Sequence, residues 1–371
     1  MGHTTILAAS IMTPARFGNL VILLALLDFT GCQHIGPKTI MDDRIPYNDA
    51  IATSWKEQTL LNIVRLRYLD VPEFVDVSSI VNGYEQGHTS SGGIGTQINP
   101  NGFIFNSLTG DLRETRTLID RPTISYAPQT SSEFTRNLTN PIPPVSILNL
   151  IESGTPADVV MELAVESING VRNRGYAGTL QEADPEFQQV IQCMAKAQAS
   201  GYVSLRVMPG AEKSSPDVVM GIRDKDISPA LAAELDQMRR ILRLDPAVKE
   251  FKIAYGTLPK ANDEIAFRTR SVLRILTFLA LNVQVPECHL ATGQAPDLGL
   301  NDSATQPQLT VFSGTEKPAE TYAATCYQGC WFWIDQRDFC SKRTMIYLKI
   351  LLALADTKQK DAAPALTIRA N

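Results

Sequence analysis

The side chains of this 371-residue chain that could most readily bind a metal ion or act as nucleophiles belong to six cysteines and four histidines. Thiolates and imidazoles are the usual zinc ligands, and a cysteine beside a histidine can form a nucleophile with its base. Cys288-His289 and Cys326-x3-Cys330 lack the spacing of a zinc finger or a zinc ribbon. We therefore predict no metal site, no cofactor, and no cysteine nucleophile activated by His289 or His88.

Four cysteines are candidates for disulfide bonds, namely Cys288, Cys326, Cys330 and Cys340. If Cys326 and Cys330 lie on one extended strand, their Cα atoms are about 13 Å apart. That separation exceeds the roughly 7 Å that a disulfide bond can span. A bond from this strand would therefore have to reach Cys288 or Cys340, and the sequence leaves the pairing open. Cys193 is expected to be a buried free thiol on a helix.

An aromatic segment at residues 327–338 holds two of the three tryptophans. On a strand, Trp331 and Trp333 share one face, and Phe332 and Ile334 share the other. We expect a central strand that is covered on both faces. The alternative is an exposed aromatic surface that stacks on a sugar, a peptide or a partner protein. The candidate binding residues of this surface are Tyr327, Trp331, Trp333 and Asp335.

Catalytic motifs do not favour an enzyme. The sequence contains no Gly-x-Ser-x-Gly elbow, no Walker loop and no His-Glu-x-x-His motif. A pair of carboxylates leaves no local signature, so a hydrolase with Trp331 and Trp333 as subsites and Asp335 as acid or base stays an alternative. The simpler interpretation of Asp335 and Asp338 is that they bind backbone N–H groups in a strand-to-helix turn.

Charge and composition exclude two further classes of protein. The chain has 34 Lys+Arg against 39 Asp+Glu, a net charge of −5, and thus no concentrated basic surface for nucleic acid. A hydrophobic content of 44% over this length excludes intrinsic disorder. The glycine-rich residues 86–96 lack the third glycine and the following helix of a dinucleotide-binding loop. We predict that they form a hairpin loop.

Residues 1–31 have the pattern of a cleaved export signal. The apolar run at residues 20–27 has the length of a signal-peptide core, whereas a membrane span needs about 20 apolar residues. Phe29-Thr30-Gly31-Cys32 follows and resembles the lipobox of bacterial lipoprotein precursors. The resemblance implies cleavage before Cys32 and acylation of Cys32, for example by palmitate. Gln33, which stands where aspartate would favour the inner membrane, favours the outer membrane.

Further segments resemble a group of uncharacterised bacterial lipoproteins without known activity, namely residues 60–68, 121–126, 331–335 and 341–344. We expect a lipid-anchored envelope lipoprotein that acts as a non-catalytic binding or assembly module facing the periplasm. Its expected partners are the membrane, through the anchor, and an envelope protein or cell-wall material. The alternative is an envelope hydrolase acting on cell-wall or glycan substrates. Strands within residues 74–126 could also pair with the sheet edge of a partner.

The order of expected strands and helices along the sequence predicts an α+β fold, with antiparallel or mixed sheet hairpins and packed helices. After the signal, we expect a tether over 32–48, a helix and β-rich segment over 49–129, and an α+β body over 130–371. Helices are predicted over 49–69, after Thr130 as an N-cap, from Pro143, Pro156, Pro185 and Pro229, after Ser271, and through Met345 to Ala355. Strands are predicted over 74–81, 102–106, 115–119, 122–126, 202–208, 218–223, 249–255, 264–267, 322–334 and 364–368.

Overall fold

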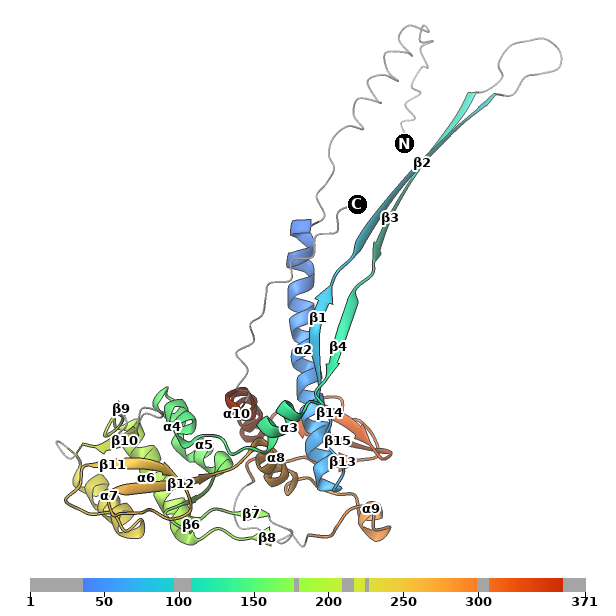
Figure 1. The fold of residues 1–371 in the computed structure, drawn as a ribbon. Coiled ribbons are helices and arrows are strands. Elements are labelled where there is room, and N and C mark those ends of the chain that lie inside the picture. The colour runs from blue at the N-terminus through green and yellow to red at the C-terminus, as the bar shows by residue number, and fades with distance from the viewer. Residues whose placement is uncertain are drawn as a thin grey trace, which may run out of the picture. The chain divides into compact units, whose positions relative to one another are not determined.

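The computed structural model describes residues 36–96, 108–176, 180–208, 217–223, 227–298 and 307–355. The predicted signal peptide with Cys32, and the strands expected over 102–106 and 364–368, lie outside the described residues. The chain forms two compact units, one with residues 1–50 and 81–123 and the other with residues 51–80 and 124–371. The fold of the described residues is α+β, as predicted (Figure 1).

The first unit contains a long antiparallel hairpin of β2 (Tyr84–Thr96) and β3 (Leu108–Asp120). The strands pair without a break from Tyr84 opposite Asp120 to Thr96 opposite Leu108. The prediction that residues 86–96 form a loop is therefore wrong, because they are part of β2. The ladder consists of backbone N–H and C=O groups, which glycine supplies as other residues do.

Helix α2 (Gly36–Arg67) begins earlier than predicted, inside the segment expected to be a tether. Pro46 lies within the helix. A proline lacks the N–H of one helical hydrogen bond, but α2 continues past this position. In the first unit, Asp43 accepts hydrogen bonds from Asn82 Nδ2, at 2.6 Å, and from the hydroxyl of Tyr84. In the second unit, the fully buried residues of α2 include Leu60, Ile63 and Val64.

The second unit is built around a six-stranded sheet in the order β6-β5-β12-β11-β10-β9. Its strands are β5 (Val165–Ile168), β6 (Val171–Arg172), β9 (Val203–Met208), β10 (Asp217–Ile222), β11 (Glu250–Tyr255) and β12 (Glu264–Thr269). Neighbouring strands are antiparallel except β11 and β12, which are parallel. The predicted hairpin of β9 and β10 is confirmed, and β11 and β12 lie close to their predicted bounds.

The described helices of the second unit other than α2 are α3 (Ser132–Thr139), α4 (Pro144–Glu152), α5 (Ala157–Ala164), α6 (Pro185–Ala199), α7 (Pro229–Ile241), α8 (Val272–Ala280), α9 (Glu287–Ala291) and α10 (Phe339–Ala355). Ser228 and Ser271 cap α7 and α8 with their side chains, as predicted. The N-cap of α3 is Ser131 rather than the predicted Thr130. Most helix starts were therefore readable from local sequence.

A second sheet of three antiparallel strands has the order β13-β15-β14. Its strands are β13 (Phe312–Gly314), β14 (Thr321–Tyr327) and β15 (Cys330–Asp335). The single strand predicted over 322–334 is therefore wrong, because the chain reverses at Gln328-Gly329. Their φ angles of 46° and 81° are both positive, as in the two-residue turns that join antiparallel strands.

Two small sheets complete the second unit. β1 (Val75–Val81) pairs with β4 (Thr123–Pro128), and β7 (Gly175–Tyr176) pairs with β8 (Leu180–Gln181). The predicted strands over 74–81 and 122–126 are thus confirmed. Along the described part of the chain, no helix combines the length and the apolar character needed to span a bilayer.

Candidate functional site

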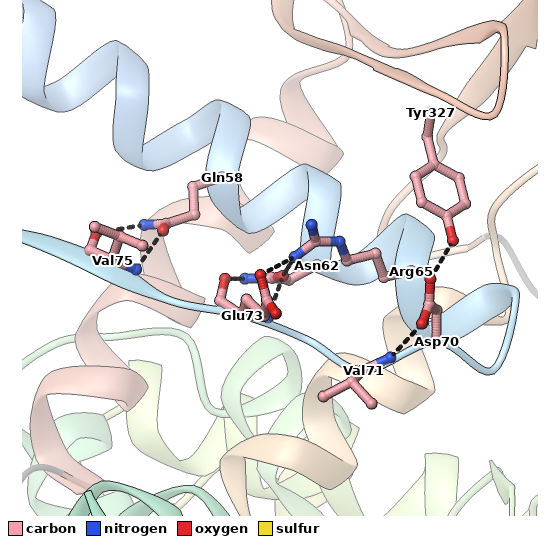
Figure 2. A network of polar contacts seen from close by, with 8 residues as sticks. All are labelled: Gln58, Asn62, Arg65, Asp70, Val71, Glu73, Val75 and Tyr327. Carbon is pink, nitrogen blue, oxygen red and sulfur yellow. Dashed lines mark hydrogen bonds and ion pairs between the residues drawn. The ribbon is translucent and has the colours of Figure 1, made fainter. Parts of the chain in front are cut away.

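Two side-chain amides of α2 hold the chain segment that follows the helix (Figure 2). Gln58 donates from Nε2 to the C=O of Val75 at 3.1 Å, and its Oε1 accepts the N–H of Val75 at 2.6 Å. Asn62 makes the same pair of bonds with Glu73, at 2.7 and 2.9 Å. Positions four apart on a helix rise about 6 Å and positions two apart on an extended segment about 6.6 Å, so the two amides match alternate residues of the segment that leads into β1. Each amide therefore takes the place of a neighbouring strand.

Asp70, in the turn after α2, connects this region to β14 (Figure 2). Its Oδ1 accepts the N–H of Val71 at 2.9 Å, and its Oδ2 accepts the hydroxyl of Tyr327 at 2.6 Å. The hydrogen bond from Tyr327 is the main cause that lowers the pKa of Asp70. Burial, followed by the bond to Asp70, raises the pKa of Tyr327. Tyr327, predicted as a binding residue, thus joins two elements of the fold.

Tyr68, just after the C-terminal end of α2, occupies the buried space beside this link. Its ring lies edge-on to the rings of Tyr327, Phe332 and His289, with centroids 5.2, 6.0 and 5.7 Å away. Its hydroxyl oxygen is 2.7 Å from His289 Nδ1. Burial strongly raises the pKa of Tyr68, so the phenol keeps its proton at neutral pH.

His289 lies between Tyr68 and two thiols. Its other ring nitrogen, Nε2, is 3.7 Å from the Sγ atom of Cys330. One ligand atom each from Cys288, His289 and Cys330 forms a group in which all separations are within 4.8 Å. His289 and Cys330 are buried, whereas Cys288 is exposed. Burial and the neighbouring Cys288 raise the pKa of Cys330, which further favours the protonated thiol.

The four candidates for disulfide bonds, Cys288, Cys326, Cys330 and Cys340, are free thiols in the structure. Cys326 and Cys330 lie on neighbouring strands, so the separation assumed for one extended strand does not apply. Cys193 is a buried free thiol, as predicted, and burial raises its pKa to about 11. Of the two partners that the sequence left open for this strand, Cys288 lies near Cys330, together with His289.

The two tryptophans of β15 lie on the face opposite to the buried residues of the strand, as predicted. Trp333 stacks on Phe312 with a centroid distance of 6.1 Å, and the Nζ atom of Lys317 is 5.2 Å from the ring centroid of Trp331. Both indole rings are half-buried. Asp335 accepts the N–H of Arg337 at 2.7 Å. The predicted turn role of Asp335 is thus confirmed, and each tryptophan already has a partner side chain.

Sequence reasoning missed a buried charge cluster near the main sheet. Arg270 is 2% exposed and donates to the backbone C=O groups of Glu162 and Leu163, at 2.9 and 3.0 Å. Burial lowers the pKa of Arg270 to about 10. Glu162 accepts a hydrogen bond from Gln308 Nε2 at 2.6 Å, and burial raises the pKa of its carboxyl. Arg270 therefore binds backbone carbonyl groups in the core. The sequence around it does not indicate that this arginine is buried.

Comparison with known proteins identified no relative. No protein-family model matches the chain, and no curated protein or solved structure is similar to it.

Proposed function

We propose that this chain is a lipid-anchored lipoprotein of a bacterial envelope that serves as a non-catalytic assembly module on the periplasmic face of the outer membrane. The lipobox-like Phe29-Thr30-Gly31-Cys32 supports the anchor, because the acylated thiol would hold the remaining chain at the membrane. The resemblance to uncharacterised lipoproteins supports the same location in the cell envelope.

The observation that carries the assembly role is the exposure of the β1–β4 sheet. No residue of either strand is buried, and the sheet contains no third strand among the described residues. Val75, Ile124 and Tyr126 are exposed by 41%, 40% and 65%. Two-stranded sheets are at best marginally stable alone, and an unpaired strand edge is a template for another strand. Because Gln58 already binds the N–H and C=O of Val75 in β1, a strand from another envelope protein would pair with the outer edge of β4.

Site-specific photo-crosslinking in intact cells tests the assembly role. A photo-reactive amino acid at Tyr126 is compared with one at Tyr255 of β11, which is a matched control because it is a strand tyrosine exposed by 57%. We expect a discrete crosslinked product from position 126 and none of the same mass from position 255. Mass spectrometry of the product distinguishes a second copy from another envelope protein. Equal products from both positions, or none from position 126, would contradict the assembly role.

Fractionation of cells that produce Cys32→Ser tests the anchor separately. Without the thiol no acyl chain can be attached, so we expect the variant to leave the outer-membrane fraction. A variant at Cys340, an exposed thiol of α10, is the control and should stay with the membrane. Unchanged membrane association of Cys32→Ser would refute the anchor but leave the assembly role to the crosslinking result.

The envelope hydrolase is not proposed as a second function. It requires two carboxyl groups beside the tryptophans, and its candidate acid, Asp335, is engaged with the backbone of Arg337 in a turn.

A further inference from the structure

We propose that Cys288, His289 and Cys330 form a binding site for a zinc ion. The ligand atoms would be the two Sγ atoms and the Nε2 atom of the imidazole, and one ligand atom from each of the three residues already lies within 4.8 Å of the others. Two thiolates and one imidazole favour zinc over the hard cations magnesium and calcium, which prefer oxygen ligands. Zinc binding here requires neither the lipid anchor nor a partner protein.

The separation of the ligand atoms is close to that of a tetrahedral zinc site. Bonds of about 2.3 Å to sulfur and 2.05 Å to nitrogen place a sulfur and a nitrogen about 3.6 Å apart, and two sulfurs about 3.8 Å apart. His289 Nε2 and Cys330 Sγ are 3.7 Å apart. These two atoms therefore already have the separation that a shared zinc ion requires.

Tyr68 gives the histidine the orientation that a metal ligand needs. Its hydroxyl oxygen lies 2.7 Å from His289 Nδ1, on the side of the ring opposite to the sulfur atoms. When Nδ1–H donates to this oxygen, Nε2 carries a free lone pair that points toward the thiols. Zinc-binding histidines are commonly held in this way by an acceptor on the second nitrogen.

The proposed site has three protein ligands, which leaves one tetrahedral position for water or another small ligand. Closed structural zinc sites have four protein ligands, and sites with three retain an exchangeable position. Cys288 is exposed and Cys330 is buried, so the ion would lie at the boundary between the core and solvent. Upon binding, the two thiols lose their protons to solvent and the imidazole stays neutral.

Metal titration of the full chain, purified in detergent, reduced and stripped with a chelator, tests the site. The probes are Zn²⁺ alone, measured by competition with a chromogenic chelator, and Co²⁺, whose tetrahedral thiolate complexes absorb in the visible and near-ultraviolet. We expect one ion per chain and a thiolate-to-cobalt absorption band. Cys288→Ser should weaken zinc binding by more than about 100-fold. Substitution of a residue that only hydrogen-bonds to a ligand already lowers metal affinity about 10–100-fold, and loss of a ligand should cost more.

Matched variants keep the test decisive. Cys326→Ser alters an exposed thiol of β14, on the strand next to Cys330, and should bind zinc like the unaltered chain. Tyr68→Phe keeps the ring and removes the hydroxyl, and should weaken binding about 10–100-fold while leaving the cobalt band in place. Equal affinities of Cys288→Ser and Cys326→Ser would overturn the proposal. A disulfide between Cys288 and Cys330 in chain isolated from cells without reductant would overturn it as well.

Discussion

Two antiparallel strand pairs of the second unit, β14–β15 and β1–β4, differ in what covers them. Cys330, Phe332 and Ile334 of β15 are buried, and β15 has a strand on each side. No residue of β1 or β4 is buried, and the pair stands alone among the described strands. The first pair can hold ligand atoms in fixed positions, whereas the second offers backbone groups and apolar side chains to a partner. The proposed metal site thus belongs to the strand pair that neighbouring elements cover, and the proposed assembly surface belongs to the pair that is exposed.

The largest effect that distinguishes the pairs should come from removing one aromatic ring from each. Phe332 is completely buried against Tyr68, so Phe332→Ala should lower the free energy of unfolding by about 3–5 kcal/mol. Tyr126 is 65% exposed, and Tyr126→Ala should change it by less than about 0.5 kcal/mol. Urea unfolding of the purified variants measures both values. Similar losses would show that β1–β4 is part of the core.

A smaller effect should come from the amides that attach the start of β1 to α2. Asn62 is fully buried, and Asn62→Ala would leave the N–H and C=O of Glu73 without their partner. We expect a loss of about 1–3 kcal/mol in the free energy of unfolding. Gln58→Ala removes the same pair of bonds at an exposed place, where water can replace them, and should cost less. An equal cost at both positions would contradict this account of the attachment.

A substitution in the turn between β14 and β15 should instead raise the free energy of unfolding. Gln328 has a φ of 46°, which asparagine tolerates better than glutamine does, and Asn-Gly is the preferred two-residue turn. Gln328→Asn should therefore raise the free energy of unfolding by about 0.5 kcal/mol. Unchanged or lower stability in urea unfolding would indicate a different turn.

A pH-dependent effect should appear at Glu162, which belongs to neither pair. Its pKa is raised mainly by burial and also by Asp158, against the opposing effects of Gln308, Arg270 and Arg174. A raised pKa means that the folded state binds the proton more tightly, so the carboxyl favours folding below its unfolded pKa and loses this contribution as pH rises. Glu162→Gln should therefore unfold at a higher urea concentration at pH 8, and the difference should shrink toward pH 4. A difference that grows on acidification would contradict the burial of this group.

Local elements of the fold were largely predictable from sequence. A serine before a proline or an apolar run marks the starts of α7 and α8, since its side chain accepts a free N–H of the first turn. Alternation along β15 correctly separated the tryptophans from Phe332 and Ile334. The turn at Gln328-Gly329 was missed although its glycine was visible, because the apolar run on both sides resembles one long strand.

The candidate site could not be predicted in the same way. Tyr68, His289 and Cys330 come from three distant segments, and no spacing rule connects them. The sequence argument against a metal treated Cys326 and Cys330 as one ligand pair. The hairpin instead directs Cys330 alone toward His289, while Cys326 is exposed. The packing of α9 and the end of α2 against the β14–β15 hairpin brings these atoms together.

Hydrogen exchange tests the contrast between the two strand pairs most directly. Exchange is measured by mass spectrometry on the detergent-purified chain and on the chain in native outer membranes. We predict that amides of β14–β15 exchange slowly in both samples, while those of β1–β4 exchange rapidly in detergent and become protected in the membranes, where the proposed partner strand would cover them. Slow exchange of β1–β4 already in the purified chain would contradict an open assembly surface.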